Sequence, residues 1–200
     1  VRESIQLAAN GQPTAFLRPV DPTDVSQTPE FFVTTTEGHY RLEDATGVLL
    51  IHETPPLTPE GAAQVVNLLE HLAIYRNVQR LCNTAFAPAL QDAIAVGEPT
   101  AFVRGVPGSL RQPGGELMAT VGQKIAFTVQ NKRKEPLYVT VLRLGMNWEI
   151  RRLFPARGWT EKLAPGSRTF PISAELTQSS LGQPQCTEIF KIFATTKPTS

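Results

Sequence analysis

The chain contains few of the residues that build metal centres and nucleophilic sites. It has two cysteines, Cys82 and Cys186, and three histidines, His39, His52 and His71. None of these histidines has a second ligand at the spacing of a zinc site, and neither cysteine stands in a catalytic motif. We therefore expect no metal and no enzyme activity in this segment. Both cysteines are interpreted as buried free thiols, which predicts a reducing, cytoplasmic location.

Long apolar runs and phosphate-binding loops are also missing. No apolar run approaches the roughly 20 residues that cross a bilayer, and no charged-then-apolar leader opens the chain. The glycine pair in "QPGGEL" is not followed by the Lys-Ser/Thr and the helix of a phosphate loop. We therefore expect no membrane partner and no cofactor. Because the first residue is Val1 rather than methionine, we expect a piece cut from a longer protein.

The net charge of +1 is unevenly distributed along the sequence. Residues 1–100 carry 5 Lys/Arg and 12 Asp/Glu, whereas residues 101–200 carry 14 Lys/Arg and 6 Asp/Glu. Such a split favours two modules that either pack on each other or face different partners. Apolar residues make up 41% of the chain, which is typical of a globular protein rather than a disordered one.

The first half of the chain contains one strong helical period. Residues 58–82 carry apolar residues mostly at three- and four-residue spacing, which predicts a helix with one buried face. Thr58 is a suitable N-cap, and Pro59 suits the first helical position. Before this helix, turn residues separate three short strands, which we expect at 31–35, 39–42 and 48–52. Residues 1–94 are therefore predicted to form a small α+β subdomain.

Strand signals dominate from about residue 95 onward. Seven short apolar segments, from "TAFVRGV" to "TEIFKIFATT", are separated by turns such as "NKRKEP", "PARG" and "APGS". In "KIAFTVQN", Ile125, Phe127 and Val129 alternate with smaller residues, as in a strand with one buried face. This pattern predicts an antiparallel Ig-like β-sandwich over residues 95–200. The whole chain is then mainly β, and α+β in class.

The segment "PLYVTVLRLGMNWEIRRLFP" predicts two neighbouring strands joined by a turn at 145–147, where Gly and Asn tolerate positive φ. Arg151 and Arg152 are adjacent, so their side chains are expected on opposite faces of the strand. Arg152 would share its face with Trp148 and Ile150, which predicts an arginine that partly covers an aromatic ring. Arg and Trp often dominate contact energies when partly buried. Trp148, Arg151 and Arg152 are therefore candidate protein-contact residues.

Three stretches together resemble a known protein family. They are "LLEHLAIYRNVQRL" at 68–81, "VGQKIAFTVQNKRKEPLYVTVLRLGMNWEIRRLFP" at 121–155 followed by "LAPGS", and "EIFKIFATTKPTS" at 188–200. In this order they resemble the accessory region that follows the peptidase domain in bacterial caspase-like proteins, the orthocaspases and their relatives. The resemblance implies a parent protein that is a cysteine peptidase favouring Arg or Lys before the cleaved bond. The family's His-Gly and Asp-Cys catalytic motifs have no counterpart here, so no catalytic residue is carried over.

The resulting hypothesis is a non-catalytic accessory or regulatory domain that works by protein contact. Its expected partner is the caspase-like peptidase domain of the same parent protein, or another protein. Two alternatives stay open: a basic β-sandwich that binds nucleic acid or another polyanion, and a part of the peptidase chain that contributes to substrate access. Nucleic acid is the less favoured partner, because strand alternation scatters the basic residues Arg143, Arg151, Arg152 and Arg168.

Overall fold

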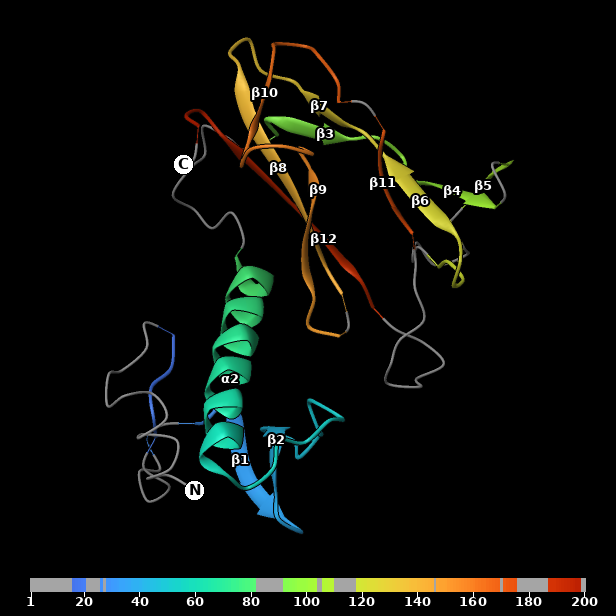
Figure 1. The fold of residues 1–200 in the computed structure, drawn as a ribbon. Helices are drawn as coiled ribbons and strands as arrows, with labels where there is room; N and C mark the ends of the chain where they lie inside the picture. Colours follow the sequence, from blue (N-terminus) through green and yellow to red (C-terminus); the bar gives the residue numbers. More distant parts are fainter. Residues whose placement is uncertain are drawn as a thin grey trace. The chain divides into compact units, whose positions relative to one another are not determined.

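The computed structural model describes residues 16–20, 26, 28–81, 92–103, 106–109, 118–145, 147–169, 171–175 and 187–198. Over these residues the chain is mainly antiparallel β with one helix, which confirms the predicted mainly-β, α+β class (Figure 1). The chain divides into two compact units, Val1–Arg80 and Leu81–Ser200. Within the described part, no helix has both the length and the apolar character that a membrane crossing requires.

The first unit contains an antiparallel hairpin of β1 (Phe31–Thr36) and β2 (His39–Asp44). Its two turn residues have positive φ, 51° at Glu37 and 77° at Gly38, as the common two-residue hairpin turn requires. This hairpin confirms the first two predicted strands and the turn between them.

The third strand expected in this region, at 48–52, does not form. The segment contributes a single bridge, between Leu49 and Glu43. The Asp44 carboxylate instead accepts hydrogen bonds from the backbone N–H groups of Thr46 and Val48, at 2.8 and 3.0 Å. These bonds and one from the Thr46 hydroxyl, which is the largest cause, hold the pKa of Asp44 below its usual value. The carboxylate thus folds the chain into a turn where a third strand would need extended backbone.

The helix α2 (Pro59–Arg80) follows the pattern seen in the sequence. Thr58 caps it as predicted, because its Oγ1 accepts a hydrogen bond of 3.1 Å from the Gly61 N–H. The buried face of α2 contacts β2. The largest buried side chains of this unit are Tyr40, Leu42, Leu50, Val65, Val66, Leu69, Leu72 and Tyr75. The unit therefore has a small core of its own, formed by one helix face and one hairpin.

Gly61 lies where the first turn of α2 passes the preceding loop at very short range. A Cβ atom at this position would lie 1.8 Å from the carbonyl oxygen of Pro56. That oxygen belongs to backbone that is itself held, since Pro56 forms a bridge with His39. No rotation of a side chain can relieve such a contact, so only glycine fits here.

We expect Gly61→Ala to destabilise the first unit. In an ordinary helix interior the same change stabilises by about 0.5–1 kcal/mol. Here the clash with Pro56 forces the helix and the loop apart, and overpacking of this kind costs about 1–3 kcal/mol. Chemical denaturation followed by far-UV circular dichroism measures the change. Gln64→Ala, at an exposed position of the same helix, is the control and should change stability by less than about 0.5 kcal/mol. A Gly61→Ala variant as stable as the control would contradict the close approach.

The second unit is built around the long strand β8 (Leu137–Leu144), which pairs antiparallel with three others (Figure 1). On one side it pairs with β12 (Ile189–Thr195) over its whole length after Leu137. On the other side it pairs first with β10 (Glu161–Leu163) and then with β9 (Ile150–Phe154). We call this the β8 sheet.

A second layer of strands faces the β8 sheet across the core. In this layer β6 (Lys124–Phe127) pairs with β11 (Ile172–Glu175) on one side and with β4 (Thr100–Val103) on the other, and β4 pairs with β5 (Val106–Ser109). Next along the chain from β6, β7 (Val129–Asn131) pairs with β3 (Ile94–Val96). The shared core consists of Ala93, Phe127, Val129, Leu137, Val139, Val141, Leu163 and Ile172. Its members come from both layers, so alternate residues of β8 face inward. The Ig-like topology of this arrangement stays a prediction.

The second unit takes in residues that the sequence pattern assigned to the first. Ala93 is buried in the core of the second unit, and Ile94 packs against that core. The Ala93 carbonyl accepts a hydrogen bond of 2.9 Å from the Lys132 N–H, and β3 pairs with β7. Residues 82–91, which include Cys82, lie outside the described residues, as does Cys186.

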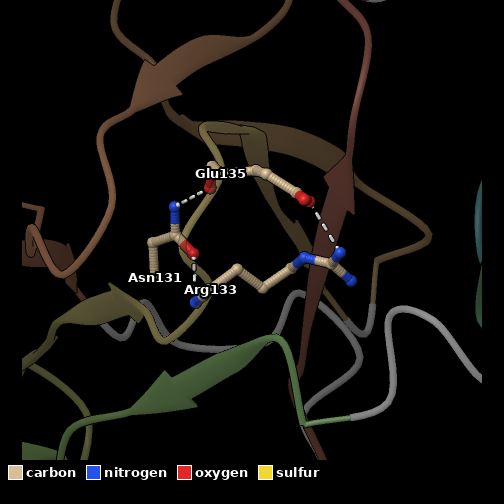
Figure 2. A network of polar contacts seen from close by, with 3 residues as sticks. All are labelled: Asn131, Arg133 and Glu135. Carbon is tan, nitrogen blue, oxygen red and sulfur yellow. Dashed lines mark hydrogen bonds and ion pairs between the residues drawn. The ribbon is translucent and has the colours of Figure 1, made fainter.

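A fully buried amide, Asn131, joins three parts of the second unit. Its Nδ2 donates to the carbonyl oxygens of Glu135 at 2.8 Å, Leu163 at 3.0 Å and Ala164 at 3.3 Å. Its Oδ1 accepts from the Arg133 N–H at 2.8 Å, and Figure 2 shows how the amide sits inside this turn. The backbone N–H and C=O of Asn131 bond to the 164–167 turn. The residue thus fixes the turn before β8 and the end of β10 together.

We expect Asn131→Asp to destabilise the second unit by more than about 3 kcal/mol at neutral pH. The carboxylate has the shape of the amide but lacks its N–H donors, and it would face carbonyl oxygens while buried. Those oxygens would raise the folded-state pKa of the new carboxyl. The folded state then binds the extra proton more tightly, so the loss of stability should be smaller at pH 5 than at pH 7. Denaturant titrations at both pH values measure this. Asn77→Asp, at an exposed position of α2, is the matched control, and an equal effect of both variants would contradict the role of Asn131.

Candidate functional site

The most exposed tryptophan of the described chain lies in the loop between β9 and β10. Trp159 is 68% exposed, which is unusual for so large an apolar side chain. The loop is held to the β8 sheet because the Thr140 hydroxyl donates a hydrogen bond of 2.5 Å to the Trp159 carbonyl oxygen. Gly158, with a φ of 71°, makes the turn just before it. The backbone of Trp159 is therefore fixed while its ring faces solvent.

Arg152 of β9 stacks on this ring. Its Cζ atom lies 5.5 Å from the centroid of the Trp159 ring, within the range of a cation–π interaction. A guanidinium over an aromatic ring keeps N–H groups that can donate to a carboxylate or phosphate. The pair is thus an apolar surface and an oriented cation side by side.

The aromatic partner of Arg152 differs from the one that the sequence pattern predicts. Trp148 lies in the turn between β8 and β9, half-buried and with a φ of 62°, so it is not part of the strand. The turn is longer than the predicted 145–147, since the Gly145 N–H bonds to the Glu149 carbonyl at 2.8 Å. Arg152 does share a strand face with Ile150, as expected, but the ring that it covers is Trp159.

The register of β9 confirms that Arg151 and Arg152 point to opposite faces. Arg151 lies opposite Arg143 of β8, and Arg152 lies opposite Leu142. Both arginines are exposed, and β9 has an irregular register between Val141 and Leu142 of β8. The two side chains therefore do not form one clamp, and only Arg152 faces the same side as Trp159.

Arg143, which the sequence counted among the scattered cations, is a structural residue. Its side chain is 4% exposed and forms an ion pair with Glu188, just before β12. Its Nη1 also donates a hydrogen bond of 3.0 Å to the carbonyl oxygen of Glu175, at the end of β11. Arg143 thus ties the β8 sheet to the second layer and is not available to a partner.

The outward face of the β8 sheet gathers the remaining features around Trp159. Alternation places Tyr138, Thr140 and Leu142 of β8 on this face, opposite the core residues Val139 and Val141. Cross-strand register adds Arg152 beside Leu142 and Lys162 beside Tyr138. We call Arg152, Trp159 and Lys162, with the three β8 residues beneath them, the Trp159 surface.

The cations of β9, β10 and the loop between them have no acidic partner among the described residues. Arg151, Arg152, Arg157 and Lys162 are all exposed, and none of them forms an ion pair with a described residue. The ion pairs elsewhere, such as Arg133 with Glu135 at 2.7 Å, lie outside the Trp159 surface. Unpaired cations beside an exposed aromatic ring are what an external anionic group needs.

The three histidines, His39, His52 and His71, are exposed and lie on separate elements. Among the described residues, no three His, Cys, Asp or Glu side chains gather where a metal could bind. The outward face of β6 and β11 carries an open hollow of about 560 Å³. Its described lining residues are Phe102, Gly122, Lys124, Ala126, Pro171, Ser173 and Glu175.

A signal for Trp159 is present in the sequence. It stands in "PARGWT", after a turn that contains proline and glycine and just before the short strand β10, where a large apolar residue has little room to pack inward.

Comparisons of the chain with protein-family models, with curated proteins and with solved structures give no match. The resemblance to the caspase-like accessory region therefore stays a prediction.

We expect Trp159→Ala and Arg152→Ala each to lower the stability of the second unit by less than about 1 kcal/mol, since an exposed cation–π pair contributes about 0.5–1 kcal/mol. Leu137→Ala, which removes a fully buried side chain, should cost about 2–5 kcal/mol. Denaturant titration of the three variants measures the difference. If Trp159→Ala costs as much as Leu137→Ala, then the ring is part of the core and the surface described above is wrong.

Proposed function

We propose that this chain is a non-catalytic accessory domain of a caspase-like cysteine peptidase, and that it works by binding protein through the Trp159 surface. The observation that carries the proposal is the exposed Trp159 ring with Arg152 stacked on it. Tryptophan and arginine are enriched among the few residues that supply most of the free energy of a protein interface.

The arrangement of the pair favours binding over packing. The Trp159 loop is fastened to β8 through Thr140, and Arg152 is restrained by the ring, so little conformational entropy is lost when a partner binds. A fixed aromatic surface with an oriented cation beside it is a suitable centre for an interface. The exposed Lys162, on the same face, would add a second cation to this interface.

The partner follows from the resemblance and from the charge of the chain. The resemblance implies a peptidase domain in the same parent protein, and that domain is the first partner to test. The basic second half of this chain would attract an acidic surface, because complementary charge speeds and orients association. The interaction should therefore weaken as salt concentration rises.

Binding of nucleic acid or another polyanion is a second candidate, because the exposed cations Arg152 and Lys162 share one face with an exposed aromatic ring. A polyanion releases condensed counterions when it binds, so its affinity falls steeply with salt. A protein interface centred on Trp159 would depend on the ring as well as on charge. Salt dependence combined with the Trp159→Ala variant therefore separates the two functions.

We expect the chain to bind the caspase-like peptidase domain of its parent, and the double variant Arg152→Ala/Trp159→Ala to bind at least tenfold more weakly. The reason is that truncating a hot-spot Trp or Arg to alanine weakens the free energy of binding by about 2 kcal/mol or more. Isothermal titration calorimetry at two salt concentrations measures the affinity. Lys132→Ala/Lys134→Ala, which removes two exposed charges from the turn before β8, is the control and should bind within about twofold of the wild type.

Three results would contradict the proposal. They are the absence of any complex at low salt, a double variant that binds like the wild type, and binding that both double variants weaken equally. The last result, together with steep salt dependence and tight binding of single-stranded DNA, would favour the polyanion function. Circular dichroism of each variant checks that the fold is kept.

A further inference from the structure

Three side chains of the Trp159 surface form a line along the direction of the strands. Arg152 lies beside Leu142, and Lys162 lies beside Tyr138. Trp159 is attached between these two positions, because its carbonyl oxygen accepts the hydrogen bond from Thr140. Along the strand direction, the attachment point of Trp159 therefore lies between the two cations, and its ring lies at Arg152, with its centroid 5.5 Å from Cζ.

The spacing of the line matches an extended peptide. Leu142 and Tyr138 are four residues apart on one strand, and a strand rises about 3.3 Å per residue, so the two cations stand about 13 Å apart at their bases. In an extended partner, side chains at positions i, i+2 and i+4 point the same way and cover the same length. Such a segment can place one side chain on each member of the line.

The chemistry of the line identifies the side chains that would fit. The guanidinium of Arg152 and the ammonium of Lys162 have no ion pair within the described chain, so each can take a carboxylate. The Trp159 ring, next to Arg152, is apolar and the residue is 68% exposed, so the ring can take an apolar side chain. No acidic side chain of β8 or β9 faces this side, since the outward residues are Tyr138, Thr140, Leu142, Ile150 and Arg152.

We infer that the partner presents an extended acidic segment in which an apolar residue lies between two carboxylates, at i, i+2 and i+4. The inference rests on the proposed function and specifies its partner. The two carboxylates bind Arg152 and Lys162, and the apolar side chain packs on Trp159. A nucleic acid strand is less well suited, because this line offers one exposed ring and two cations rather than a run of stacking rings.

The test uses the whole chain and a blocked seven-residue peptide with glutamate at its second and sixth positions, leucine at its fourth and threonine elsewhere. We expect measurable binding by isothermal titration calorimetry or by chemical-shift changes at Trp159. Replacing either glutamate by glutamine should weaken binding about two- to fivefold, the range of one exposed ion pair. Arg152→Gln and Lys162→Gln should each do the same, whereas Lys134→Gln, an equal loss of charge elsewhere, should not.

A second peptide tests the spacing, with the two glutamates moved next to each other at the same net charge. Weaker binding of this peptide supports the line of Arg152, Trp159 and Lys162. Equal binding of the two peptides, or insensitivity to Lys162→Gln, would overturn the inference. The inference would also fail if single-stranded DNA of equal charge displaced the peptide and bound equally well to the Trp159→Ala variant. The outcomes also separate this inference from the proposed function. If the peptide binds and the peptidase domain does not, the inference holds and the proposed partner is wrong. If the peptidase domain binds through Trp159 but the peptide does not bind, the proposed function holds and the inference fails.

Discussion

The second unit depends on one buried amide. Asn131 has no exposed surface, and both its backbone and its side-chain groups are hydrogen-bonded. A buried polar group is stabilising only when its partners are in place, and leaving one unpaired costs about 1–3 kcal/mol. The amide therefore requires the turn before β8, which Figure 2 shows, to be in one arrangement with the end of β10 and the 164–167 turn. With β10 held at its end, Lys162 and the loop that carries Trp159 take fixed places along β8.

The interior and the surface of this unit use arginine in opposite ways. Arg143 is buried and its charge is balanced by Glu188, so it serves to hold two layers together. Breaking such a pair by removing one partner leaves a buried charge and costs about 3–5 kcal/mol. Arg152 is exposed, has no acidic partner in the described chain and rests on an aromatic ring. Its contribution to stability is small, and its charge is available for the contact that the proposed function requires.

The sequence predicts those features whose causes are local. Helix α2 and its Thr58 cap follow from periodicity and a single side-chain hydrogen bond, and the hairpin of β1 and β2 follows from Gly38. Two failures concern contacts between distant residues, whereas the missing third strand at 48–52 has a local cause in the hydrogen bonds that Asp44 accepts. The ring beside Arg152 comes from another loop, and Arg143 is buried because Glu188, 45 positions away, can reach it. Strand alternation alone gives the face of Arg152 but not its neighbour.

The central claim is that a partner meets this chain at Trp159, and a photo-reactive amino acid at that position tests it most directly. The parent protein would carry the reactive group at position 159, or at position 148 for comparison, since Trp148 is half-buried in the neighbouring turn. After illumination, mass spectrometry identifies the cross-linked segments. The account predicts a cross-link from position 159 to an acidic segment of a protein partner, lost at high salt, and little or none from position 148. Cross-links from position 148 but not from 159, or none from either position, would contradict it.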